Sequence, residues 1–105
     1  MTPLRVRGRG CAEVAGYGLA DAEHQVEKEI GRAWPGSRVA VEEVGRGTGP
    51  GSIVETFRVG FRVEGPVDAQ GESPEELRRD AFRRARARLA GTRFRGVVWE
   101  AAEPR

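Results

Sequence analysis

Apolar and polar residues alternate along the first part of the chain. Between residues 4 and 15 one set of alternate positions is apolar or glycine, namely Leu4, Val6, Gly8, Gly10, Ala12 and Val14. The intervening positions are polar or charged, namely Arg5, Arg7, Arg9, Cys11 and Glu13. A period of two is typical of a strand with one buried face, so this pattern predicts a strand over 4–15.

The period changes after Gly16-Tyr17-Gly18. Apolar residues now recur at intervals of three and four, at Leu19, Ala22, Val26, Ile30 and Ala33. This spacing predicts an amphipathic helix, which Pro35-Gly36 would end. A second strand is predicted over 38–44.

The clearest alternation lies over residues 53–64. Ile53, Phe57, Val59, Phe61 and Val63 fall on one side of this predicted strand, and Val54, Thr56, Arg58, Gly60 and Arg62 fall on the other. The first set is apolar, so it is the predicted core face. We expect Phe57, Val59 and Phe61 to be buried against both helices. The next eight residues, 65–72, are rich in glycine and polar residues and predict a loop.

A second helix is predicted from Ser73 onward. Ser73 has the character of an N-cap, Pro74 suits the first turn, and Glu76 would complete a capping box. The apolar stripe is Leu77, Ala81, Phe82, Ala85 and Leu89, and Gly91 would end the helix. A last strand is predicted over 93–100, with Phe94 and Val98 toward the core and with Arg95, Val97 and Trp99 on the open face. A short polar tail would follow.

These elements give the order β-α-β-β-α-β within a single α+β domain over residues 1–105. Two right-handed β-α-β units in this order form a ferredoxin-like sandwich, in which both helices cover one face of a four-stranded sheet. The chain has no apolar run long enough to cross a membrane and no signal segment, and its single cysteine cannot form an internal disulfide. We therefore expect a cytoplasmic protein.

The open face of the predicted sheet is the candidate site. It would gather the residues Arg5, Arg7, Arg9, Arg58, Arg62, Arg95 and Trp99. Arginines beside an aromatic ring on an open sheet are one layout of a single-strand nucleic-acid platform. A single exposed tryptophan is also a common interface anchor, so we favour a contact between subunits. In that case the arginines need carboxylate partners across the interface, with Glu13, Glu64 and Glu100 nearest in sequence.

The glycine-rich stretch GRGTGPGS, residues 45–52, raises the question of a phosphate loop. Phosphate loops lead into the N-terminus of a helix, but here the glycines lie between two predicted strands. We interpret the stretch as a wide hairpin in which Arg46 and Thr48 could touch a ligand or a neighbouring subunit.

Other candidate chemistry is weaker. Of the 18 basic residues only Lys28 is a lysine, a bias that a GC-rich genome can produce. The second predicted helix carries many of the arginines, either as a solvated face or as a phosphate surface. A small enzyme would have to use Cys11, His24 or Tyr17. His24 stands among glutamates on a helix, and no set of residues has metal-ligand spacing.

Residues 4–64 resemble a dodecin, a small flavin-binding β-α-β-β protein that assembles into a hollow dodecamer. The likeness lies in VEEVGRGTG, in IVETFRVGFRVE and in the helical stretch GLADAEHQVEKEIGRA. The resemblance implies an alternative fold, a dodecin-like unit with an added α-β segment. Dodecins bind flavin with a Trp and a Gln. The corresponding positions in this chain are approximately those of Arg38 and Val54, and Trp34 comes several residues before the expected Trp. Flavin binding is therefore not carried over with the resemblance.

Taken together, the sequence predicts a non-enzymatic, self-associating α+β protein that presents a ligand- or partner-binding surface. The alternative is a nucleic-acid-binding module that uses the arginine-rich sheet face.

Overall fold

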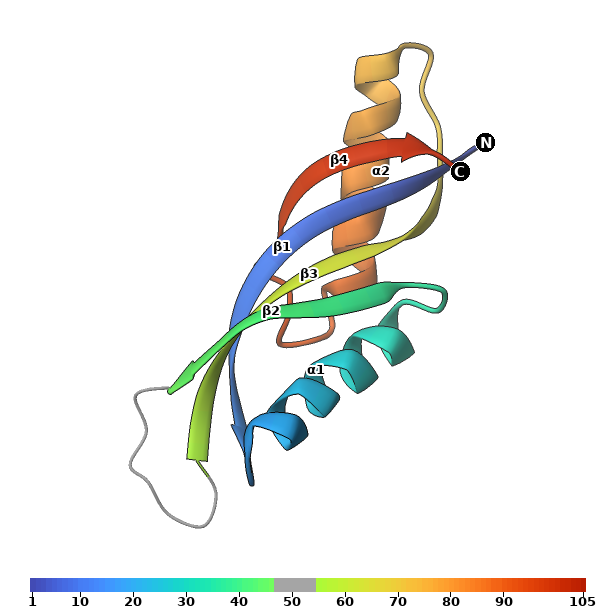
Figure 1. Ribbon diagram of the computed structural model, residues 1–105. Coiled ribbons are helices and arrows are strands. Elements are labelled where there is room, and N and C mark those ends of the chain that lie inside the picture. The colour runs from blue at the N-terminus through green and yellow to red at the C-terminus, as the bar shows by residue number, and fades with distance from the viewer. Residues whose placement is uncertain (47–54) are drawn as a thin grey trace.

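The structure, a computed structural model, describes residues 1–46 and 55–105. Its elements are β1 (Thr2–Gly16), α1 (Leu19–Ala33), β2 (Arg38–Arg46), β3 (Glu55–Ala69), α2 (Pro74–Leu89) and β4 (Val98–Pro104). The four strands form one sheet in the order β2-β3-β1-β4, and every neighbouring pair is antiparallel (Figure 1). The predicted α+β class and the predicted order of elements are confirmed. Ile53 and Val54, predicted to begin the third strand, lie outside the described residues.

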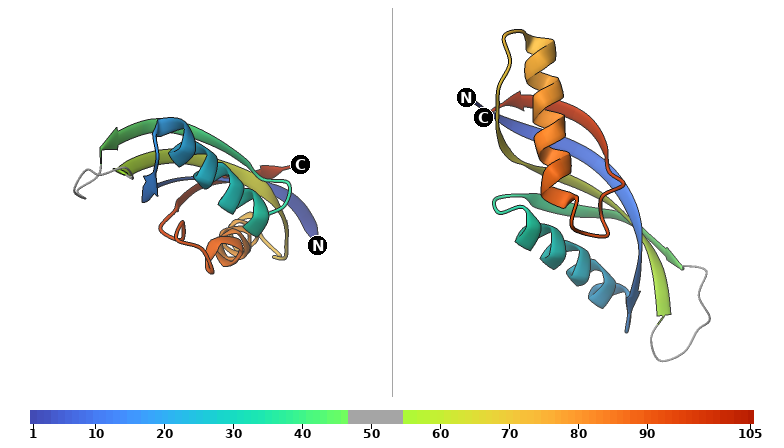
Figure 2. Two further views of the ribbon diagram at one scale, coloured as in Figure 1. Left: turned by 90° about the horizontal axis from the view of Figure 1, so that it is seen from below. Right: turned by 180° about the vertical axis from the view of Figure 1, so that it is seen from behind.

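Both helices lie on the same side of the sheet, as the view from behind in Figure 2 shows. α2 lies behind β4, β1 and β3, and α1 lies along β2. The opposite face carries no helix, and we call it the open face. The two ends of the chain lie side by side, where Arg105 N donates a hydrogen bond to Pro3 O and the Arg105 guanidinium contacts Asp68.

The hydrophobic core lies between the sheet and the two helices. Phe57, Val59 and Phe61 are buried there, as predicted, and they pack with buried positions of α1 and α2. The strand register agrees with this, because Gly10 is opposite Phe61 and Ala12 is opposite Val59, on the same face. The predicted core faces of the first and third strands are therefore correct over the described residues.

The predicted loop over residues 65–72 is wrong at its beginning, because β3 continues to Ala69. Residues 65–69 pair with the start of β1, where Val6 is opposite Gly65 and Thr2 is opposite Ala69. Pro66 is compatible with this strand because β2 ends its pairing at Glu64, which leaves one side of β3 without a neighbour. On that free side the indole N–H of Trp34 donates to Pro66 O at 2.8 Å.

The last strand also differs from the prediction over 93–100. β4 begins at Val98 and continues to Pro104, so the predicted polar tail is part of the sheet. Residues 93–97 are not strand, although Phe94 still reaches the core from this connection. The register of the observed strand is set by β1, where Leu4 is opposite Pro104 and Arg9 is opposite Val98.

The faces predicted for the last strand are reversed at three positions. Val98 is 69% exposed on the open face, whereas Val97 is buried and Trp99 packs against the core. The reason is Gly8, which is opposite Trp99 and has no side chain. A Cβ atom on Gly8 would lie 2.8 Å from Trp99 Cε3, so the indole fills the space that this glycine leaves.

α2 begins at the predicted cap, because Ser73 Oγ accepts a hydrogen bond from Glu76 N. The reciprocal bond of a capping box is displaced by one residue, since the Glu76 carboxylate accepts from Glu72 N and not from Ser73 N. Farther along the helix, Asp80 Oδ2 accepts hydrogen bonds from Gln70 N at 2.8 Å and from Arg84 Nε, and Asp80 Oδ1 accepts one from the Arg83 guanidinium. Asp80 thus joins α2 to the end of β3.

We predict that Asp80 contributes to the loss of folding stability at low pH. The hydrogen bond from Gln70 N, followed by those from Arg84 and Arg83, holds the pKa of Asp80 well below its ordinary value of 3.8. The stabilisation is therefore complete above the unfolded-state pKa and is lost as the pH falls below about 4 toward the folded-state pKa. Melting curves from pH 7 to pH 2 should show a shallower acid loss in Asp80→Asn than in the native chain. An equal acid loss in Asp80→Asn would contradict the prediction, and Asp68→Asn is the matched control.

The protein is elongated. Its principal extents are 53 × 22 × 20 Å and its radius of gyration is 15.1 Å, above the value of about 13 Å typical of a compact domain of 100 residues. Part of the cause is that β4 covers only residues 4–9 of β1, so the rest of β1 has a strand on one side only. Neither α1 nor α2, nor any other described segment, is a helix long and apolar enough to cross a membrane.

Candidate functional site on the open sheet face

The arginines predicted on the open face of β1 and β3 lie there. Arg5, Arg7 and Arg9 follow one another on β1, and Arg62 is directly opposite Arg9 on β3. Their side chains are between 38% and 53% exposed, although Nε of Arg62 is buried and has no hydrogen-bond partner among the described residues. Strand alternation thus places three of these cations in a row along β1 and the fourth beside the end of that row, on β3.

Carboxylates from β2, β3 and β4 pair with these four arginines. Arg5 pairs with Glu64 at 3.5 Å, and Arg7 pairs with Glu103 at 3.6 Å. Arg9 and Arg62 both pair with Glu42 at 3.5 Å, and Arg9 also reaches Glu100 at 3.6 Å. We call this set the ion-pair lattice; its members are Arg5, Arg7, Arg9, Arg62, Glu42, Glu64, Glu100 and Glu103. The arginines therefore do not form an unbalanced positive surface.

Two β-bulges place the central carboxylates of the lattice. The register between β2 and β3 shifts after Val41, and the register between β1 and β4 shifts after Arg7. Each shift adds one residue to an edge strand, Glu42 on β2 and Glu100 on β4. A bulge changes the direction of a side chain, and here both extra residues reach Arg9 on the open face, one from each edge strand of the sheet.

The lattice contributes little to stability, and we predict a small effect for Arg9→Ala. Arg9 is 53% exposed, and exposed ion pairs are typically worth between 0 and about 1 kcal/mol each. The urea midpoint of Arg9→Ala should therefore correspond to a loss below about 1 kcal/mol. The native chain should lose a similar amount in 1 M NaCl, whereas Arg9→Ala should respond less to salt. A loss of several kcal/mol would mean that Arg9 is structural.

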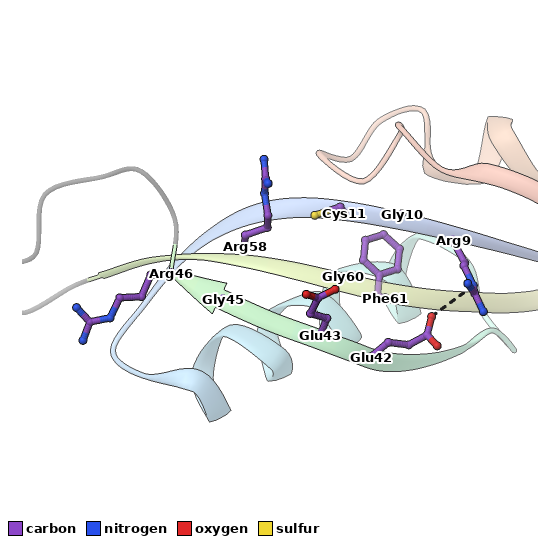
Figure 3. A pocket seen from close by; sticks show the side chains of 10 residues that line it. All are labelled: Arg9, Gly10, Cys11, Glu42, Glu43, Gly45, Arg46, Arg58, Gly60 and Phe61. Carbon is purple, nitrogen blue, oxygen red and sulfur yellow. Dashed lines mark ion pairs between the residues drawn. The ribbon is translucent and has the colours of Figure 1, made fainter.

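Beside the lattice, the open face has a hollow of about 450 Å³ (Figure 3). Gly60 lies at its centre, between Cys11 on β1 and Glu43 on β2. Because Gly60 has no side chain, the backbone is exposed between these neighbours. Arg58 stands on the same face of β3, and its guanidinium points away from the sheet in Figure 3. The hollow thus combines a thiol, a carboxylate and a guanidinium around exposed backbone.

The remaining predicted site residues lie outside the ion-pair lattice. Trp99 lies on the helix side, with its ring edge-on to that of Trp34 at a centroid distance of 5.9 Å. Arg95 is exposed in the connection before β4, and Arg46 is exposed at the end of β2, at the far rim of the hollow. Thr48 lies outside the described residues. The aromatic ring on which a nucleic-acid platform depended is therefore absent from its predicted place.

Sequence reasoning missed Glu42 and Glu103 as partners of the arginines. Glu103 was assigned to a tail, because the last strand was placed too early. Glu42 had a visible signal, since the stretch Val41-Glu42-Glu43-Val44 interrupts the alternation of β2 with two adjacent carboxylates. Such an interruption in an edge strand is typical of a bulge.

The residues considered for catalysis do not meet in the described structure. Cys11 lines the hollow on the open face, whereas His24 is exposed on α1 and Tyr17 lines a separate depression near the start of that helix. Within residues 1–46 and 55–105, no group of three His, Cys, Asp or Glu side chains is placed to hold a metal ion. Of the residues connected with flavin, Trp34 is fully buried, and Arg38 is exposed at the start of β2.

The arginines of α2 differ from those of the sheet. Asp80 holds Arg83 and Arg84, but no carboxylate in the described part of the chain pairs with Arg78, Arg79, Arg86 or Arg88. The acidic side of α1 does not pair with α2 either. Its residue Glu29 binds Arg93, which lies in the connection after α2.

Comparison with protein-family models, with curated proteins and with solved structures finds no match to this chain.

Proposed function

We propose that the chain is a non-enzymatic, self-associating α+β protein whose open sheet face is a ligand- or partner-binding surface. The observation that supports this proposal is the ion-pair lattice on a face that no helix covers. Buried charge is costly when it is unpaired. Charges that already have partners, as those of the lattice do, can be covered by another molecule without leaving isolated ions. The hollow at Gly60 gives that molecule access to the backbone and to Arg58, which has no ion pair among the described residues.

The elongated shape supports self-association. A chain of this size buries a modest core, and oligomerisation is a common means of stabilising it. Tyr17 is 77% exposed and Leu19 is 55% exposed, and both line a depression with Val44 and Phe57. These apolar groups and the sheet edges are surfaces that a second subunit could cover.

The topology supports a ferredoxin-like arrangement as the finer description of the fold. β3 lies between β1 and β2, and β1 lies between β3 and β4, so each helix connects two strands that are separated by a third. A dodecin-like relationship of residues 4–64 is the second part of the proposal. In that interpretation α2 and β4 are an addition at the β1 edge of the sheet.

Light scattering tests self-association. The expected mass at 1–100 µM protein is a multiple of 11.5 kDa. NMR screening of a small-molecule library tests the surface, and ligand-induced shifts should gather at the amides of Cys11, Glu43 and Gly60. A mass of one chain at every concentration would refute self-association, and shifts confined to the helices would refute the assigned surface.

Nucleic-acid binding is the second candidate function. One observation favours α2 over the sheet face as its binding surface. Arg5, Arg7, Arg9 and Arg62 of the sheet have carboxylate partners. Arg79 and Arg86 of α2 have none in the described chain and stand two turns apart on one helix face. Anisotropy with a labelled single-stranded oligonucleotide tests this candidate across a salt series. Arg79→Glu with Arg86→Glu should weaken binding and reduce its salt dependence, and Arg5→Glu is the control on the sheet. No binding at low salt would remove this candidate.

A further inference from the structure

The outer edge of β2 is regular and lacks a partner over its first residues. β2 is the first strand of the sheet, and its register with β3 is unbroken from Arg38 to Val41, before the bulge at Glu42. In the described part of the chain no strand pairs with its other side. Edge strands with unpaired backbone groups are templates for another strand, and proteins usually protect them with proline, a central lysine or a bulge. Residues 38–41 contain no proline, lysine or bulge, and their only charged residue is Arg38 at one end.

The sequence of this edge is complementary to itself. Residues 38–42 read Arg-Val-Ala-Val-Glu, so opposite charges stand at equal distances on either side of Ala40. If a second copy of the strand runs antiparallel with Ala40 opposite Ala40, then Val39 is opposite Val41 of the second copy, and Arg38 is opposite its Glu42. The same two contacts are repeated by symmetry. Glu42 is the bulged residue, and its carboxylate also contacts Arg9 and Arg62 of its own chain, so Arg38 of the second copy would join an existing cluster. Opposite charges and β-branched residues directly across an antiparallel pair are stabilising.

We propose that two copies of this chain associate through β2, antiparallel and centred on Ala40, to form one continuous eight-stranded sheet. The interface is isologous, as a two-fold axis requires. This inference rests on the proposed self-association and names the contact that produces it. It leaves both open faces uncovered on the same side of the sheet, so that the binding surface of the proposed function is present twice.

The environment of the edge agrees with this arrangement. Arg38 is exposed and forms no ion pair within the described residues, so it is available to a second chain. Val39 and Val41 are half-buried and pack against the core from the helix side, where an added strand would cover more of them. α1 packs against β2 and lies along this edge in Figure 1, so the added strand would have a helix on one side.

Two other free edges, those of β4 and β1, are less suitable. β4 has only seven residues, contains the bulge at Glu100 and ends in Pro104, all of which oppose strand addition. The free edge of β1 begins at Gly10, and antiparallel pairing of that edge centred on Glu13 would place two carboxylates opposite each other. Charge complementarity therefore selects β2.

The first test is a charge reversal at the edge. Arg38→Glu replaces two attractive pairs with two repulsive ones, so the dissociation constant of the dimer should rise about tenfold or more. Arg46→Glu is the matched control, since it makes the same change on the same strand beyond the bulge and should leave the constant unchanged. Light scattering over a dilution series measures both variants, with circular dichroism to confirm folding.

The second test is a cross-link at the two-fold axis. In a Cys11→Ser chain, Ala40→Cys places two thiols on directly opposed residues, whose Cα atoms are about 4.5–5.5 Å apart, a distance that a disulfide spans. Mild oxidation should therefore give a covalent dimer. Gly45→Cys is the control, because its two copies would be about 33 Å apart at about 3.3 Å per residue.

The outcomes separate the two proposals. If the native chain is monomeric at all concentrations, self-association and the β2 contact both fail. If it is oligomeric but Arg38→Glu keeps the native mass, or Ala40→Cys cross-links no faster than Gly45→Cys, then the β2 contact is overturned while self-association stands. A folded Arg38→Glu monomer together with the Ala40→Cys dimer confirms the contact.

Discussion

Phe61→Ala should lower the free energy of unfolding by about 3–5 kcal/mol, the usual range when a large buried aromatic side chain is removed. Phe61 is 2% exposed, and its ring stands edge-on to Phe94 with the centroids 5.6 Å apart. The ring also covers Gly10 on the neighbouring strand, where a Cβ atom would lie 2.7 Å from Phe61 Cζ. Because the glycine provides the space and the backbone cannot easily move into it, the alanine variant keeps a cavity.

Urea denaturation of Phe61→Ala beside Arg62→Ala measures this difference. Arg62 is the next residue on the strand, on the open face, and its exposed ion pair should be worth less than about 1 kcal/mol. A period of two means that an error of one residue in register would exchange these two results. A large loss in Arg62→Ala with a small loss in Phe61→Ala would therefore show that the assigned faces are inverted.

Trp34→Ala should have an effect of similar size, about 3–5 kcal/mol. Trp34 is completely buried at the end of α1, packs edge-on against Trp99 and donates its indole N–H to Pro66 O. It also fills the space above Gly65, where a Cβ atom would lie 2.5 Å from Trp34 Cε2. One side chain thus joins the first helix to both β3 and β4.

Trp34→Phe separates burial from the hydrogen bond. The phenyl ring keeps much of the apolar surface but leaves Pro66 O without its donor, a change that costs about 1–3 kcal/mol for a buried group. Chemical denaturation should therefore place Trp34→Phe between the native chain and Trp34→Ala. If Trp34→Phe were as unstable as Trp34→Ala, the hydrogen bond would be the main contribution, and a loss below 1 kcal/mol in both would exclude Trp34 from the core.

Local patterns were sufficient for most of the elements. Alternation identified β1 and the faces of β3, and the three- and four-residue spacing identified α1, whose observed bounds Leu19–Ala33 are the first and last residues of the apolar stripe. Ser73 fixed the start of α2 through a bond to a residue three positions away. In each case the interactions that determine the element lie within a few residues of one another.

The end of the chain depended on distant residues and could not be read locally. Trp99 was assigned to the open face because its parity was counted from Phe94, which is not in a strand. Its true side is set by Gly8, about ninety residues earlier, whose missing side chain admits the indole. Likewise residues 65–69 resemble a loop in composition, and they are strand because the first residues of the chain pair with them. The same long-range pairing gave the arginines their carboxylates.

The adjacency of the two chain ends makes the order of elements nearly cyclic. β4 ends beside the start of β1, with Pro104 opposite Leu4, so a short peptide joining residue 105 to residue 1 would turn these two strands into an ordinary hairpin. The backbone could then be opened at another exposed connection, such as the one before β4, without changing the sheet order. In a circularly permuted chain of this kind β4 would come first and would be joined directly to β1. The sheet should therefore tolerate circular permutation.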